Sequence, residues 1–153
     1  MEIDENSRTL FMKYALPCAG TLVKRGNVRQ QYIDELIECV KLNKKIPKDA
    51  EKMFKVAFAA CSLIAIDSGK KTIDESIVRK YFLSKHDEVI DKRYVEMGDF
   101  NPDMCRVRKC IAERIENGFA FVGKRRFRTD FVPYVKNGDN VITHWDFIVE
   151  TSE

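Results

Sequence analysis

The chain has 153 residues, a formal net charge of +3 and 44% hydrophobic residues, a composition that is typical of a globular protein and excludes general disorder. No apolar run approaches the roughly 20 residues needed to cross a membrane, and no signal peptide follows the acidic start, so we expect a cytoplasmic protein without a membrane partner. Five cysteines cannot all pair within one chain, which favours reduced thiols.

The first hundred residues follow the periodicity of helices rather than strands. Pro17 and Gly26 interrupt the pattern, and pairs of hydroxyl and acidic residues at Thr72 and Ser84 predict the starts of two further helices. The segment 53–66 is apolar nearly all round, which predicts the central helix of a bundle. The predicted helices cover residues 7–16, 28–42, 49–66, 72–83 and 84–94.

Turn-forming residues at 98–103 predict a boundary between a helical domain over 1–99 and a small β domain over 104–153. Beyond this boundary, Asn117-Gly118 predicts a hairpin because both residues accept positive φ angles. The alternating residues 141–149 predict one long strand. The predicted fold class is therefore α+β, with an N-terminal helical bundle followed by a small C-terminal β-barrel of the OB or HypC-like kind.

Three features of the β region occur in an order that belongs to a known family. Met104-Cys105 opens the region, the apolar hairpin 107–122 follows, and residues 138–144 read Gly-Asp-Asn-Val-Ile-Thr-His. Over about 45 residues this pattern resembles the HypC/HupF-type hydrogenase assembly chaperones. The helical part, around residues 14–17, resembles only an uncharacterised helix-plus-barrel family, which implies no function.

The resemblance implies an accessory or chaperone protein that handles an iron fragment during hydrogenase maturation. It implies that Cys105 and His144 are the metal ligands, that iron is bound transiently, and that hydrogenase maturation proteins are partners. A thiolate and an imidazole suit late first-row metals, and two ligands leave positions open for other groups. The sequence thus favours a binding protein over an enzyme, and nucleic acid is not the expected partner.

Two further residues bear on a metal site. Cys110 lies five residues after Cys105, and residues five apart in a strand point to opposite faces, so we do not expect it to share a zinc ion with Cys105 and His144. His86 falls at the start of a predicted helix, where we expect it to face the solvent.

The basic run Lys124, Arg125, Arg126 and Arg128 supports a different function, binding of a partner or nucleic acid with Phe127 as a stacking ring. A solvated hairpin tip with Phe127 in the core is the simpler interpretation of the same run. The sequence is also compatible with a scaffold that has no metal role, and with a metabolic enzyme whose site lies between the two domains.

Overall fold

The computed structural model describes residues 1–97 and 102–152, with the backbone alone between 93 and 97. Most of the predicted boundary at 98–103 therefore lies outside the described residues. The elements of the helical part are β1 (Glu2–Ile3), α1 (Glu5–Ala15), η1 (Leu16–Cys18), α2 (Ala19–Lys24), α3 (Gln30–Lys41), η2 (Ala50–Met53), α4 (Lys55–Asp67), β2 (Thr72–Ile73), α5 (Glu75–Lys80), η3 (Tyr81–Lys85) and α6 (His86–Met97).

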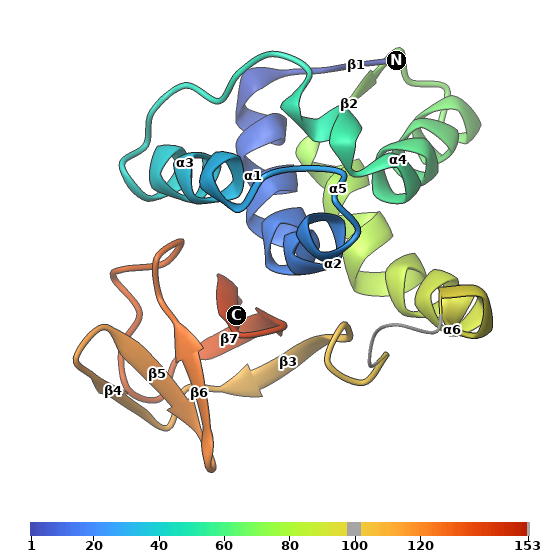
Figure 1. Cartoon of the computed structure of the whole chain (residues 1–153). Helices are drawn as coiled ribbons and strands as arrows, with labels where there is room; N and C mark the ends of the chain where they lie inside the picture. The colour runs from blue at the N-terminus through green and yellow to red at the C-terminus, as the bar shows by residue number, and fades with distance from the viewer. Residues whose placement is uncertain (98–101, 153) are drawn as a thin grey trace.

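The second part of the chain forms a six-stranded sheet. Its strands are β3 (Val107–Ile111), β4 (Arg114–Glu116), β5 (Phe119–Val122), β6 (Arg125–Arg128), β7 (Asn140–His144) and β8 (Phe147–Ser152). In Figure 1 the helices form one layer and these strands form a second layer beneath them. The predicted α+β class, with helices first and strands second, is confirmed. None of the described helices combines the length and apolar character that a membrane crossing requires.

The predicted barrel is wrong, because the sheet is not closed. Its strand order is β3-β7-β8-β6-β5-β4, so β3 and β4 are its two edges. Only two residues, Ala112 and Glu113, separate β3 from β4 along the chain. A strand cannot form an antiparallel ladder with its own direct continuation, because antiparallel pairing requires a reversing turn. One bent segment therefore supplies both edges, and it bonds to Asp139 and Gly138 at the bend.

The hairpin turns show what local sequence can and cannot indicate. Asn117 and Gly118 both have positive φ angles and join β4 to β5, as predicted. The single strand predicted over 141–149 is wrong, because the chain reverses at Trp145-Asp146 and β7 pairs with β8. Trp145 adopts a φ angle of 54°, in a region that bulky residues rarely enter. A hairpin therefore replaces the strand, although Trp145, which takes the positive φ angle, has no preference for a turn.

The last helices are continuous rather than separate. The predicted helix start at Ser84 is wrong, because its hydroxyl donates to the Lys80 carbonyl inside a π-helical turn, η3. This turn joins α5 to α6 without a break. A π-turn inserts one extra residue, which rotates every following side chain relative to a regular helix, and such turns are frequent at functional sites.

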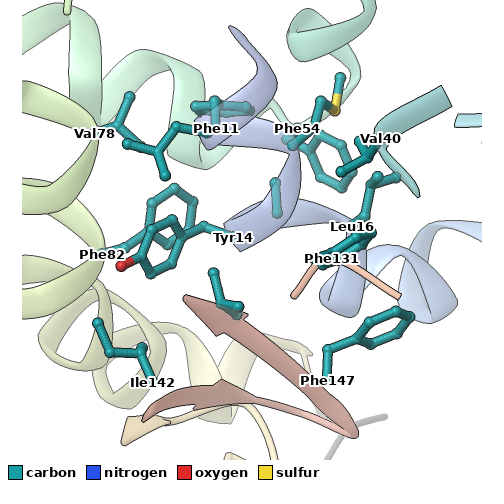
Figure 2. Close-up of a cluster of buried hydrophobic side chains, with 14 of the residues drawn as sticks. Phe11, Tyr14, Leu16, Val40, Phe54, Val78, Phe82, Phe131, Ile142 and Phe147 are labelled. Carbon is teal, nitrogen blue, oxygen red and sulfur yellow. The ribbon is translucent and has the colours of Figure 1, made fainter. Parts of the chain in front are cut away.

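The helical layer and the sheet share one hydrophobic core. Figure 2 shows Phe11, Tyr14 and Phe82 from the helices above Ile142 and Phe147 from the strands. The rings of Tyr14 and Phe82 stack with their centroids 5.0 Å apart. Polar contacts strengthen the same junction.

Those polar contacts centre on Glu150 of β8. The Tyr14 hydroxyl donates to its carboxylate at 2.5 Å, and Arg79 of α5 donates to it at 2.8 Å. Burial and the nearby carboxylate raise the pKa of Tyr14 well above its usual value, so the phenol keeps the proton that it donates. The sheet is thereby fixed against α1 and α5.

The prediction that 53–66 forms the central helix is wrong. In α4 only Cys61 and Ala65 are buried, whereas Leu63 and Ile66 are 62% and 61% exposed. The central position belongs to α1, where Phe11, Met12 and Tyr14 have no exposed surface. An all-round apolar helix therefore lies at the surface of the molecule, with one apolar side facing outward.

Candidate metal centre

Four side chains with metal-binding atoms meet between the helical layer and the sheet. They are Cys18, His86, Cys105 and His144, and one ligand atom from each lies within 4.8 Å of the others. The Cys18 and Cys105 sulfurs are 3.3 Å apart, and His144 Nε2 lies 3.0 Å from the first and 3.5 Å from the second. His86 Nε2 lies 3.8 Å from the Cys105 sulfur. This group can hold a metal ion.

Each cysteine follows a point where regular structure is broken. Cys18 comes directly after Pro17, at the end of the short η1 turn that separates α1 from α2. Cys105 lies in the turn before β3, where its backbone amide donates to the Pro102 carbonyl. Both thiols are thus presented by turns, which leaves their side chains free of the periodic packing within a helix or strand.

The two histidines come from the ends of regular elements. His86 directly follows the π-helical turn, and the extra residue of that turn rotates position 86 inward. The imidazole of His86 packs on the rings of Tyr81 and Phe82. His144 is the last residue of β7, directly before Trp145. Both imidazoles are buried, and their centroids lie 4.9 Å apart.

A second hydrogen bond orients each imidazole. The Nδ1 atom of His144 lies 2.6 Å from the Tyr14 carbonyl oxygen, which can only accept, so Nδ1 carries the proton. His86 Nδ1 lies 3.0 Å from the Asp87 carboxylate, which also accepts from the Val107 backbone amide. In both rings Nε2, the other nitrogen, faces the cysteines. Histidines that ligate metals in proteins are held in this way.

The surroundings of the two cysteines shift their pKa values in opposite directions. A hydrogen bond from Cys18 lowers the pKa of Cys105 to about 3. Burial opposes this shift, and hydrogen bonds from both histidines add to it. Burial and the adjacent Cys105 raise the pKa of Cys18 well above its usual value. Burial would lower the pKa of His86, but Asp87 and Cys105 outweigh it and raise this pKa. Cys105 is therefore the thiolate of the pair, and Cys18 ionises second.

An indole also faces the centre. The Nε1 atom of Trp145 is buried and has no hydrogen-bond partner of normal geometry among the described residues. Its N–H nevertheless lies close enough to the Cys18 sulfur to lower the pKa of that thiol, although burial outweighs this effect. A buried N–H that lacks a full hydrogen-bond partner lowers the stability of the fold. A thiolate at Cys18 would accept a hydrogen bond from this N–H.

The four atoms fit a tetrahedral ion in identity and spacing. With usual bond lengths, tetrahedral zinc separates two sulfurs by about 3.8 Å and a sulfur from a nitrogen by about 3.6 Å. The sulfurs are 3.3 Å apart, and three of the sulfur–nitrogen pairs are 3.0, 3.5 and 3.8 Å apart. All four atoms lie within 4.8 Å of one another, which is compact enough for one ion to draw them into its shell. Two thiolates also neutralise a divalent ion, which reduces the cost of burying its charge.

The same spacing favours one ion over a two-iron cluster. In a [2Fe–2S] centre with two cysteines and two histidines, the cysteines and the histidines ligate different irons. That arrangement keeps the sulfurs away from the imidazoles. Here His144 Nε2 lies 3.0 and 3.5 Å from the two cysteine sulfurs, which are themselves 3.3 Å apart. The group therefore suits a single, shared ion.

The sequence predicted two of these four residues. Cys105 and His144 are brought together as the resemblance implied, 3.5 Å apart. Sequence reasoning missed Cys18, and the expectation that His86 faces solvent is wrong. Cys110 stays outside the group, as expected, and lies opposite Val141 in the sheet. The chain has only two histidines, and the meeting of both at one site is a signal that the sequence alone does not reveal.

The basic run lies in the β5–β6 hairpin and contributes none of the four metal-binding side chains. Lys124, Arg125 and Arg126 are exposed, and Arg128 is half-buried beside Asp130. Phe127 is in the core, as the simpler interpretation of this run expected, which rules out the alternative in which its ring stacks on a base. Comparison with family models, curated proteins and solved structures finds no match for this chain, so its function must be inferred from these sites.

Proposed function

We propose that this protein binds one zinc ion through Cys18, His86, Cys105 and His144. The observation that carries this proposal is the convergence of four ligand atoms within 4.8 Å of one another, with both imidazoles held by their outer nitrogens. Four protein ligands complete a tetrahedral shell, which is typical of a structural rather than a catalytic zinc site. Bound zinc supplies a cross-link between segments that lie far apart in the chain.

Those segments explain what the ion would do. Cys18 and His86 belong to the helical layer, and Cys105 and His144 belong to the turn before β3 and the end of β7. A shared ion would fix the two layers to each other and hold their common surface in one arrangement. The protein would then act as a metal-stabilised binding or accessory protein.

The HypC-like role remains a prediction, with transient iron in place of resident zinc. Its two implied ligands, Cys105 and His144, are adjacent here, but Cys18 and His86 add two more. A four-ligand shell holds an ion more firmly than a carrier requires. Such ligands bind Zn²⁺ more tightly than Fe²⁺ in either case, so the metal that the protein carries when it is purified without oxygen distinguishes the two roles.

Metal titration of the reduced protein tests the proposal. We expect one Zn²⁺ per chain, and we expect Co²⁺ to give the visible absorption of tetrahedral thiolate coordination. Cys18→Ser and His86→Gln should each weaken binding by tenfold or more, because each removes a ligand. Cys110→Ser is the matched control and should keep full binding. Retention of zinc by all ligand variants, or its absence in the wild type, would refute the site.

A second candidate function is supported by the outer face of the sheet. The cross-strand register places Arg114, Phe121 and Arg126 in one row, with Phe119 beside them. The Arg114 guanidinium lies 4.3 Å from the Phe121 ring centre, and Arg126 lies 4.3 Å from that of Phe119. Half-exposed rings beside cations are how proteins bind single-stranded nucleic acid. We call these four residues the arginine–phenylalanine face.

Binding of a labelled ten-nucleotide oligouridylate at low salt tests this face. If the face binds RNA, Phe121→Ala should weaken binding at least about fivefold, because one stacked base contributes about 1–3 kcal/mol. Arg126→Ala should weaken binding and make it less dependent on salt. Arg29→Ala, on the helical layer, is the control. No binding by the wild type at low salt would eliminate this candidate.

A further inference from the structure

A pocket in the helical layer reaches the metal centre from one side. Its volume is about 480 Å³, within the range of pockets that hold small organic ligands. Its walls come from α2, from the start of α4 and from the η3–α6 helix. Most of the lining is apolar, including Leu22, Val28, Phe54, Ala57, Phe82 and Ile90. Such a lining favours a hydrocarbon over water.

The polar groups of the pocket are divided between its two ends. The inner end is lined by Cys18, His86 and Cys105. His86 and Cys105 are buried. Arg25 and Lys55 also line the pocket, and both are exposed to solvent, which places their charges at the mouth. The described lining residues include no aspartate or glutamate. The mouth therefore carries two cationic side chains, and the body is apolar.

We propose that this pocket binds a medium-chain carboxylate, with its hydrocarbon chain inside and its carboxylate at Arg25 and Lys55. At about 30 Å³ per water-sized group, the volume accommodates roughly 16 such groups, enough for a chain of about ten carbons. The carboxylate would pair with cations that stay in contact with water, which avoids burying a charge. The chain would cover the open side of Cys18.

This inference is independent of the proposed zinc ion, because the lining and the cations do not require one. Isothermal titration of the reduced full-length protein with decanoate tests it. We expect one molecule bound per chain, and we expect uncharged 1-decanol to bind at least fivefold more weakly. Lys55→Met should weaken decanoate binding about tenfold while leaving 1-decanol unaffected. Lys48→Met, an exposed lysine outside the lining, should bind decanoate as the wild type does.

A second variant locates the binding site. Ala57→Trp fills the pocket from α4 and should abolish decanoate binding, with circular dichroism to check that helix content is preserved. Undiminished binding by Ala57→Trp would place the ligand elsewhere and overturn the inference. So would the absence of binding by the wild type at millimolar decanoate, or equal affinities for decanoate and 1-decanol. Zinc stoichiometry, measured on the same samples, separates this result from the fate of the metal proposal.

Discussion

If the protein binds zinc as proposed, removal of the ion with a chelator should lower its melting temperature by about 10 °C. An ion present at a thousand times its dissociation constant adds about 4 kcal/mol to the stability of the folded state. For a chain of this size, each kilocalorie per mole shifts the melting temperature by about 2–4 °C. The ligands lie at positions 18, 86, 105 and 144, so unfolding separates all of them and releases the ion.

Differential scanning calorimetry with and without chelator measures this effect, after metal analysis confirms that the ion has been removed. Cys18→Ser should melt near the temperature of the chelated wild type and should not respond to chelator. Cys39→Ser is the matched control, because it makes the same change at a half-buried cysteine outside the group. It should retain the full response. An unchanged melting temperature in demetallated wild type would contradict a stabilising role for the ion.

The sequence predicts two residues of this site through a resemblance to a family pattern, in which Cys105 opens the β region and His144 ends the Gly-Asp-x-Val segment. Local periodicity does not relate them, because they lie 39 residues apart. Cys18 belongs to another layer, 87 residues from Cys105, and no periodicity relates positions so far apart. His86 depends on the π-helical turn before it. Regular helical spacing cannot predict that turn, and the orientation of His86 could not be predicted from it.

In the fold, too, the sequence predicts what neighbouring residues determine and not what distant contacts impose. Asn117-Gly118 indicates its turn through the conformations these two residues accept, and the structure confirms it. Trp145 also adopts a positive φ angle, but tryptophan has no such preference, and tertiary contacts must impose the turn. The apolar pattern of α4 suggested a central helix, yet Leu63 is exposed. Apolar composition predicts that a helix packs against the core, not how many of its sides are covered.

Replacement of Glu51 by alanine should destabilise the fold by about 3–5 kcal/mol, because it leaves a buried charge without its partner. Arg8 of α1 donates to the Glu51 carboxylate at 2.9 Å, and their side chains are 7% and 2% exposed. Arg8 also reaches the Ile3 carbonyl at 3.4 Å, which does not neutralise its charge. The pair joins α1 to η2, so its loss should loosen the start of the helical layer.

Urea unfolding of Glu51→Ala, of Arg8→Met and of the double variant Arg8→Met/Glu51→Leu measures this cost. The double variant should recover most of the stability lost by Glu51→Ala, because apolar groups of similar volume can replace a buried ion pair at little net cost. Glu5→Ala removes the partner of Lys45 in an exposed ion pair, and its effect should not exceed about 1 kcal/mol. If Glu51→Ala lowered the free energy of unfolding no more than Glu5→Ala does, water would have to reach Arg8. In that case α1 would be less tightly packed against η2 than the short contact indicates. A large loss in Glu51→Ala that the double variant recovers would instead locate the cost in the unpaired charge of Arg8 itself.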